Sequence, residues 1–258
     1  TYYYCAIVAS TEGTAFGAVS SFTTSGPPTA TTAAASSVTS SSATLNGAGN
    51  PNGANALGWF RYSQTNPGAC SDAFGTRAPS SSGLGLGTGT TSTAFAQPIG
   101  GLSPGVTYYY CAIANNSYGT GLGAVLSFTT PATVPSVTTS GASSLTRTTG
   151  VLNGYANPGG DATTGWFRYS TASPGTCNDT FGTRAPATGG AALGSGSSSV
   201  SFGQAITGLA PGVTYYYCAL AANSAGTALG GVQTFITPGS PTAITLPAGS
   251  VTTSSATL

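Results

Sequence analysis

The side chains that most enzymes use for acid–base, nucleophilic or metal chemistry are almost missing from this sequence. Its 258 residues include no His, five Lys or Arg, and four Asp or Glu. Without His, the chain lacks the usual general base and the commonest metal ligand. All the basic residues are Arg, so a Ser–Lys dyad is excluded together with a Ser–His–Asp triad. We therefore expect no enzymatic activity and no cofactor.

The few carboxylates are spaced for structure rather than for catalysis. Asp72 and Asp179 each follow a Cys by two residues and precede Arg77 or Arg184 by five. This spacing favours a local Asp–Arg ion pair that braces a loop over a catalytic acid. The other two carboxylates occur singly, whereas a calcium site needs several clustered oxygen ligands. We predict no metal site.

Composition excludes further classes of function. The net charge of +1, with no basic cluster, cannot supply the phosphate contacts that nucleic-acid binding requires. No apolar run approaches the roughly 20 residues of a membrane span. The chain should nevertheless fold, because 40% of its residues are hydrophobic, including 13 Tyr, 10 Phe and 2 Trp, whereas disorder accompanies low hydrophobicity and high net charge.

Internal repetition organises the chain. Segments that begin TYYYCA start at Thr1, Thr107 and Thr214, in steps of 106 and 107 residues. The motif WFRYS starts at Trp59 and again at Trp166, with the same step. Repetition at a fixed period indicates an array of similar structural units. Each unit spans about 107 residues, and the sequence holds about 2.4 of them.

The repeats predict a division of the chain into four segments. These are the C-terminal part of a preceding repeat (1–24), two complete repeats (25–130 and 131–239) and the N-terminal part of a following repeat (240–258). Because both ends fall within a unit, we expect the sequence to be a window from a longer tandem array.

Each unit has the local pattern of an all-β domain. Short runs rich in aromatic and β-branched residues alternate with clusters of Gly, Pro, Asn and Ser, as expected for strands and turns. No stretch has a helical apolar period, and the 39 Gly residues disfavour helices. About seven short strands in about 100 residues is typical of an immunoglobulin-like sandwich.

Residues 101–120, GLSPGVTYYYCAIANNSYGT, resemble the E–F corner and strand F of a fibronectin type III domain. The pattern Leu-x-Pro-x-Thr-x-Tyr leads there into Ala-x-Asn-x-x-Gly. The matching residues are Leu102, Pro104, Tyr108, Asn116 and Gly119 in one unit, and Leu209, Pro211, Tyr215, Asn223 and Gly226 in the other.

The segment ATLNGAGNPNG followed by WFRYS resembles the fibronectin type III-like repeats of very large bacterial surface and secreted proteins. The resemblance covers the whole chain and implies tandem sandwiches, but such a fold says little about activity. The sequence departs from the common pattern in its cysteines and its lack of charge.

The five cysteines follow the repeat. Cys70 precedes Cys111 by 41 residues, and Cys177 precedes Cys218 by the same number. This spacing predicts one disulfide in each unit, with buried free thiols as the alternative. Cys5 would then pair with a residue outside the sequence. Disulfides form in oxidising compartments, so we expect an extracellular or cell-surface protein.

Strand alternation predicts an outer face for the sheet that carries the WFRYS and TYYYCA motifs. If Tyr108 points inward, so do Tyr110 and Phe60, and their neighbours point outward. The outer residues are then Trp59, Arg61, Tyr109 and Ile113 in one unit, and Trp166, Arg168, Tyr216 and Leu220 in the other. An exposed apolar stripe marks an assembly face, and Trp59→Ala would leave the domain folded. Alternatively, the Trp and Tyr side chains cover the disulfide and an Arg stacks on an aromatic ring.

These features favour a non-enzymatic extracellular structural repeat protein that self-associates into a filament, stalk or sheath. A near-zero net charge removes the repulsion that keeps proteins apart. Two alternatives remain, the projecting stalk of an adhesin and a spacer module of a secreted polysaccharide-degrading enzyme. Sequons at Asn115 and Asn178 and the many Ser and Thr residues are compatible with attached glycans, although sequons also arise by chance in such a composition.

Overall fold

A computed structural model describes residues 1–257, which form β-strands and loops. The chain divides into two compact units, Thr1–Thr133 and a second that begins at Val134. We call them unit 1 and unit 2. Each contains a two-layered β-sandwich, so the predicted all-β fold is confirmed. Within the described residues there is no helix of the length and hydrophobicity needed to cross a bilayer.

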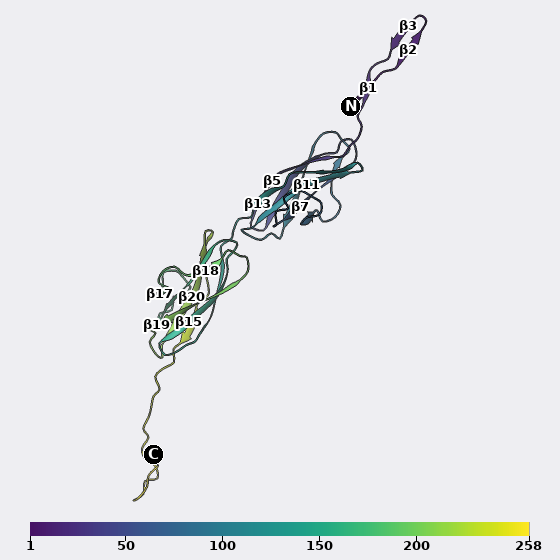
Figure 1. The fold of residues 1–258 in the computed structure, drawn as a ribbon. Helices are drawn as coiled ribbons and strands as arrows, with labels where there is room; N and C mark the ends of the chain where they lie inside the picture. Colours follow the sequence, from purple (N-terminus) through teal and green to yellow (C-terminus); the bar gives the residue numbers. More distant parts are fainter. Residues whose placement is uncertain (258) are drawn as a thin grey trace. The chain divides into compact units, whose positions relative to one another are not determined.

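The sandwich of unit 1 pairs a smaller sheet with a larger one (Figure 1). The smaller sheet has the antiparallel order β10-β6-β5, with β10 at Thr93–Gly100, β6 at Ser42–Asn50 and β5 at Thr29–Ser36. The larger sheet is built on β11 (Thr107–Asn116) paired with β7 (Ala56–Ser63). Its edges are β8 (Thr76–Ala78) and β9 (Leu84–Gly87) beside β7, and β12 (Gly119–Leu122) and β13 (Leu126–Thr129) beside β11.

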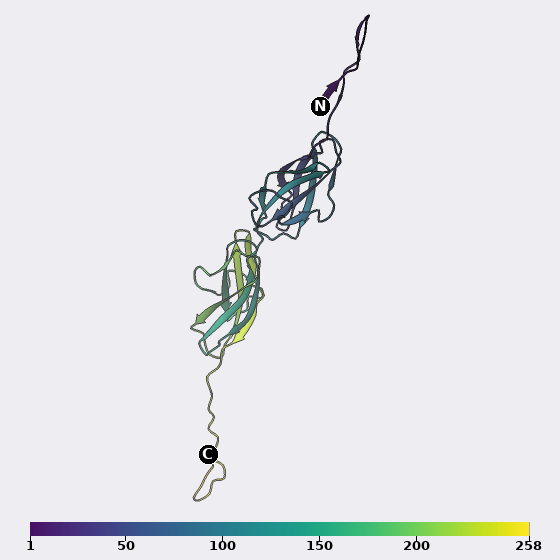
Figure 2. The ribbon, with the colours of Figure 1, turned by 45° about the vertical axis from the view of Figure 1, so that its right-hand side comes forward.

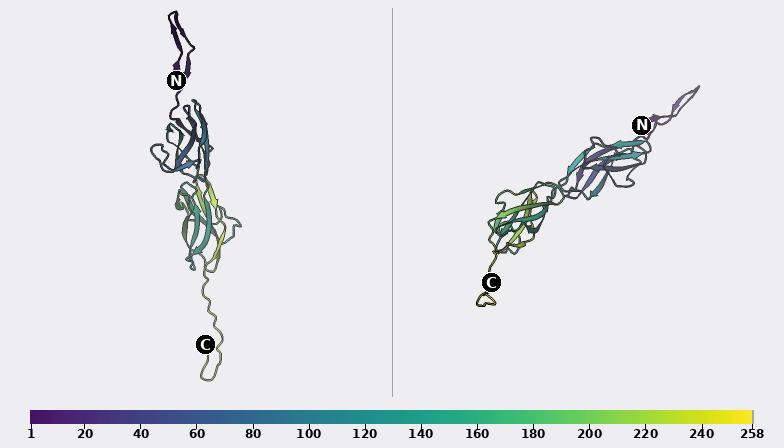
Figure 3. Two further views of the ribbon diagram at one scale, coloured as in Figure 1. Left: turned by 90° about the vertical axis from the view of Figure 1, so that its right-hand side faces the viewer. Right: turned by 60° about the horizontal axis from the view of Figure 1, so that its bottom comes forward.

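Unit 2 repeats this topology strand for strand. Figure 2 and Figure 3 show the ribbon of each unit from other sides. Its smaller sheet contains β14 (Ser136–Ser143), β15 (Thr149–Asn157) and β19 (Val200–Thr207). Its larger sheet contains β16 (Thr163–Ser170), β17 (Thr183–Ala185), β18 (Ala191–Gly194), β20 (Thr214–Asn223), β21 (Gly226–Leu229) and β22 (Gln233–Ile236). Two face-to-face antiparallel sheets in this strand order form an immunoglobulin-like, fibronectin type III-like sandwich.

The main core of each unit lies between the two sheets. In unit 1 it contains Phe60 and Tyr110, which are both fully buried, with Phe95 from the opposite sheet. The Phe60 and Phe95 rings lie 4.9 Å apart, and the Tyr110 hydroxyl donates a hydrogen bond to the Ala33 carbonyl at 2.7 Å. Burying one such aromatic side chain stabilises a fold by roughly 1.5–3 kcal/mol. The inward orientation predicted for Tyr108, Tyr110 and Phe60 is confirmed.

A hydrogen-bonded tyrosine fixes the chain reversal before β11. The Tyr108 hydroxyl accepts a hydrogen bond from the Ser103 backbone N–H at 2.9 Å, and Tyr215 repeats the contact with Ala210. This is the tyrosine corner of such sandwiches. Cys111 follows Tyr108 by three residues, so strand alternation places Cys111 on the opposite face of the sheet.

The chain also has two segments with no buried side chain, residues 1–24 and 240–257. The first contains β1 (Tyr2–Tyr4), β2 (Ile7–Ser10), β3 (Gly13–Phe16) and β4 (Ser20–Phe22). β1 pairs with β4 and β2 pairs with β3, in the register that β11 has with β13 and β12. The assignment of these segments to flanking repeats stays a prediction.

Candidate functional site

A loop in each unit folds over the outer face of the larger sheet, and this arrangement is the most elaborate side-chain site in the chain. We call residues 64–75 and 171–182 the capping loops. A disulfide joins Cys70 in the first loop to Cys111 of β11, with 5.9 Å between the Cα atoms. Cys177 and Cys218 are joined in the same way in unit 2. The prediction of one disulfide per unit is therefore confirmed.

The capping loop encloses a second, smaller core. In unit 1 this outer cluster is formed by Trp59, Cys111 and Ile113 from the sheet, with Cys70 and Phe74 from the loop packed against them. In unit 2 the corresponding residues are Trp166, Cys218 and Leu220, with Cys177 and Phe181. The centre of the larger sheet is thus buried on both faces, by the smaller sheet on one side and by the capping loop on the other.

The prediction of an exposed apolar stripe is wrong at its centre. Trp59 and Trp166 each retain 7% exposure, and Ile113 and Leu220 are fully buried. The flanking residues Tyr109, Tyr216, Arg61 and Arg168 are half-buried. Strand alternation assigns a side chain to a face correctly, but it does not reveal that a loop returns over that face. A lateral contact through these tryptophans would require the loop to leave the sheet.

The carboxylate of Asp72 holds the loop to the sheet through two hydrogen bonds to one oxygen. The Trp59 indole N–H and the Arg61 Nε–H each donate to Asp72 Oδ1 at 2.8 Å. The Arg77 guanidinium lies over the Trp59 ring, 4.5 Å from its centroid. The tryptophan is therefore fixed at its edge by the carboxylate and on its face by a cation, and the Arg-on-aromatic alternative is correct.

The predicted pairing of Asp72 with Arg77 is wrong, because Arg61 takes the carboxylate instead. Arg61 and Arg77 lie directly opposite each other on β7 and β8. Like charges in that position repel, and the Asp72 carboxylate beside Arg61 offsets this repulsion. Arg77 is then free to stack on the indole and to donate hydrogen bonds to the Pro79 and Ser82 carbonyls.

Unit 2 contains the same contacts at matching positions. Asp179 Oδ1 accepts hydrogen bonds from the Trp166 indole at 2.8 Å and from Arg168 Nε at 2.9 Å. Arg184 lies 4.8 Å from the Trp166 centroid and opposite Arg168 across the strands. The indole–carboxylate–guanidinium contacts are therefore a property of the repeat.

The hexapeptide FGTRAP, at Phe74 and again at Phe181, supplies parts of this site that sequence reasoning missed. Phe74 packs on the outer cluster, and Gly75 turns the chain into β8 with a φ of 53°. A Cβ at Gly75 would collide with the Tyr62 carbonyl, so only glycine fits. The hexapeptide is identical in both units, and this identity could have identified its residues as part of the site.

Burial acts to raise the pKa of Asp72, but hydrogen bonds from Arg61 and Trp59 and the charges of Arg61 and Arg77 outweigh it. The pKa of Asp72 is therefore held below its ordinary value of 3.8. A carboxyl whose pKa is lower in the folded state stabilises the fold above its unfolded-state pKa. That contribution is lost as the pH falls from about 4 through the folded-state pKa.

We expect Asp72→Asn to lower the melting temperature of unit 1 at pH 7 and to flatten its decline below about pH 4. The amide keeps the shape of the side chain but removes the charge that Arg61 pairs with. Calorimetry between pH 2 and 7 measures both effects. Unit 2, with Asp179 intact, serves as the internal reference, and Glu12→Gln is the control for a neutralised exposed carboxylate. An unaltered pH profile would show that Asp72 does not stabilise the loop.

Other residues singled out by the sequence lie outside this site. Cys5 is exposed with a free thiol, and its pairing outside the sequence stays a prediction. The Asn115 side-chain amide donates hydrogen bonds to Gly119 O and Thr120 Oγ1, and Asn178 lies in the second capping loop. Among residues 1–257, His, Cys, Asp and Glu form no group of three that could hold a metal ion.

No model of a protein family and no curated protein matches the sequence. Among solved structures, the chain is similar to the crystal structure of the FN1–FN3 domains of chicken CNTN1. The sequence identity is 16%, the TM-score is 0.28, and the match covers 92% of this chain and 75% of that chain. So distant a likeness carries no argument about function. The fold assignment rests on the strand order, the tyrosine corners and the two-sheet core.

Proposed function

We propose that the chain belongs to a non-enzymatic extracellular protein whose tandem sandwiches build a cell-surface filament, stalk or sheath. The observation that carries this proposal is the repetition of the whole capping arrangement. The disulfide, the Asp–Arg pair and the Arg–Trp stack all recur in unit 2. Repetition of the stabilising contacts, residue for residue, supports a role in which each module must resist unfolding.

The two disulfides support an extracellular location. Each disulfide closes a loop of 41 residues, which corresponds to about 4 kcal/mol of stabilisation in the chain-entropy model. Such bridges persist in oxidising compartments and are rare in the cytosol. A module whose capping loop is bonded covalently to its larger sheet suits a protein outside the cell.

The surface of the smaller sheets supports self-association. In unit 1, β5, β6 and β10 contain no charged residue, and in unit 2 the same is true of β14, β15 and β19. Charged side chains are a common device that prevents edge strands from pairing with other chains. Their absence, with a net charge of +1, favours strand pairing and lateral contact between copies.

Electron microscopy of the native, unreduced full-length protein tests this proposal. We expect long continuous fibres with a repeating subunit. Isolated thin rods that end in a knob would contradict self-assembly and support the stalk of an adhesin. Dispersed single particles at the native protein concentration would overturn the structural proposal.

A further inference from the structure

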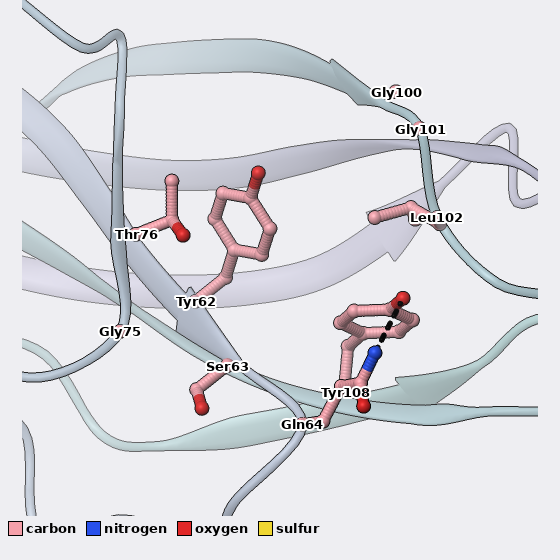
Figure 4. Close-up of a pocket in the computed structure, with 9 residues that line it drawn as sticks. All are labelled: Tyr62, Ser63, Gln64, Gly75, Thr76, Gly100, Gly101, Leu102 and Tyr108. Carbon is pink, nitrogen blue, oxygen red and sulfur yellow. Dashed lines mark hydrogen bonds between the residues drawn. The ribbon is translucent and has the colours of Figure 1, made fainter.

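A hollow of about 410 Å³ opens at one end of the unit 1 sandwich (Figure 4). It lies where β7 ends, where β8 begins and where the chain leaves β10 toward the tyrosine corner. Its lining includes Tyr62, Gln64, Thr76, Gly100, Gly101 and Tyr108. Gln64 and Gly75, which also lines the hollow, are the first and last residues of the capping loop, but none of these side chains belongs to the outer cluster or to the contacts of Asp72.

Two tyrosines line the hollow, the half-buried Tyr62 and the buried Tyr108. The Tyr62 and Tyr108 ring centroids lie 6.5 Å apart, with the planes tilted by 51°. Figure 4 shows both side chains directed into the hollow, with the Gln64 amide at the Tyr108 hydroxyl. Tyr108 is fixed, because Ser103 N–H and Gln64 Nε2 both donate to its hydroxyl at 2.9 and 3.2 Å. Tyr108 itself is buried, with 5% exposure, so the aromatic surface that the hollow offers is that of the half-buried Tyr62.

Polar groups without protein partners surround these rings. Within residues 1–257, the Tyr62 hydroxyl, Thr76 Oγ1 and Gln64 Oε1 make no hydrogen bond to the protein. At Gly100 and Gly101 a Cβ would meet no atom within 4 Å, so this rim is open to an approaching molecule. Ligand sites combine apolar walls with a few polar groups that fix orientation.

The lining contains no charged residue, which decides the class of ligand. Arg61 and Arg77, the nearest basic residues along these strands, are engaged by Asp72 and Trp59. A charged ligand would lose hydration without gaining an ion pair. A neutral ring with an apolar face for tyrosine and hydroxyl groups at its edge fits this chemistry.

We propose that this hollow binds an uncharged sugar unit of a polysaccharide. One C–H face of a pyranose would pack on Tyr62, and its hydroxyls would meet the Tyr62 hydroxyl, Thr76 and Gln64. The site is a binding function separate from self-assembly. Fibres that bind no sugar would overturn only this proposal, whereas sugar binding by dispersed single particles would overturn only the filament.

Unit 2 supplies a natural comparison. It keeps the aromatic pair as Tyr169 and Tyr215, 6.3 Å apart. At the positions of Gln64 and Gly100, however, it has Thr171 and Thr207. Thr171 has no side-chain amide and is shorter than Gln64, and Thr207 adds a side chain at the open rim. We therefore expect unit 1 to bind the sugar and unit 2 not to bind it.

NMR titration of the full 258-residue chain tests the proposal, with four hexasaccharides as probes: cellohexaose, chitohexaose, xylohexaose and maltohexaose. We expect at least one probe to shift backbone signals of Tyr62, Thr76 and Gly101, with a millimolar Kd. Tyr62→Ala should weaken this binding at least tenfold, and Tyr62→Phe should weaken it a few-fold, because only the hydroxyl is lost. Tyr169→Ala, the matched change in unit 2, should leave the Kd unchanged.

Grafting between the units gives a second test that replaces no aromatic residue, and Tyr108 keeps its hydrogen bond from Ser103 N–H. Gln64→Thr with Gly100→Thr places the side chains of unit 2 at exposed positions of unit 1 and should abolish binding. Thr171→Gln with Thr207→Gly should create a second site in unit 2. The proposal is overturned if no probe shifts these signals at 10 mM. Equal binding by both wild-type units, or by the grafted unit 1, would also overturn it.

Discussion

Removal of the Cys70–Cys111 disulfide, by Cys70→Ala with Cys111→Ala, is expected to lower the free energy of unfolding of unit 1 by about 4 kcal/mol. The figure follows from the entropy that a 41-residue closed loop removes from the unfolded chain. For a domain of this size, it corresponds to a fall in melting temperature of roughly 15–30 °C. Replacing both cysteines leaves neither bridge partner as an unpaired thiol, so the only free thiol among the described residues of unit 1 is Cys5, as in the wild type.

Calorimetry of the oxidised full chain measures this effect against an internal control. Unit 2 retains Cys177–Cys218, so its transition should stay in place while that of unit 1 moves to lower temperature. Treatment of the wild-type protein with a reductant should move both transitions. If the double variant melts like the oxidised wild type, the bridge does not contribute to stability and the proposed mechanical role loses its main support.

The sequence predicts correctly the strands, the disulfide of each unit and the inward-facing Tyr110, because these follow from the repeat and from strand alternation. Local interactions account for other features that recur with the repeat. The hairpin that begins TYYYCA has the same strand register in residues 1–24, where nothing is buried, as in β11–β13. The turn in which the Thr39 hydroxyl bonds to Ser42 recurs at Thr146 and at Thr252. Because neighbouring residues suffice for these features, a repeated sequence reveals them.

The features that sequence reasoning missed depend on contacts between segments whose arrangement no local rule gives. Alternation placed Trp59 and Ile113 on the outer face, but it did not show the capping loop above them. Sequence spacing suggested Arg77 as the partner of Asp72, whereas the pairing of β7 with β8 brings Arg61 and Arg77 together. The hollow lined by Tyr62 and Tyr108 combines residues from four separate segments, so no single sequence motif predicts it.

Trp59→Ala is expected to destabilise unit 1 by about 3–5 kcal/mol, the usual cost of truncating a buried aromatic side chain. This reverses the expectation from an exposed stripe, under which the domain would stay folded at little cost. The substitution empties the outer cluster beside the disulfide and removes the cation–π contact with Arg77. It also takes one hydrogen-bond donor from Asp72.

Thermal unfolding of Trp59→Ala measures the loss, and Tyr118→Ala is its control. Tyr118 is a large aromatic residue of the same unit with 57% exposure, so its truncation should change the free energy of unfolding by no more than about 0.5 kcal/mol. Equal effects of the two variants would mean that the capping loop does not bury Trp59 in solution.

A double-mutant cycle then connects the tryptophan to the carboxylate. Because Trp59 and Arg61 share one oxygen of Asp72, Trp59→Ala and Asp72→Asn remove parts of the same network. Residues in one network are non-additive by roughly 0.5–3 kcal/mol, so the double variant should lose less stability than the two single variants together. Strict additivity would show that the indole and the carboxylate stabilise the unit independently. The capping loop would then be held by the disulfide and not by the polar contacts that recur with it.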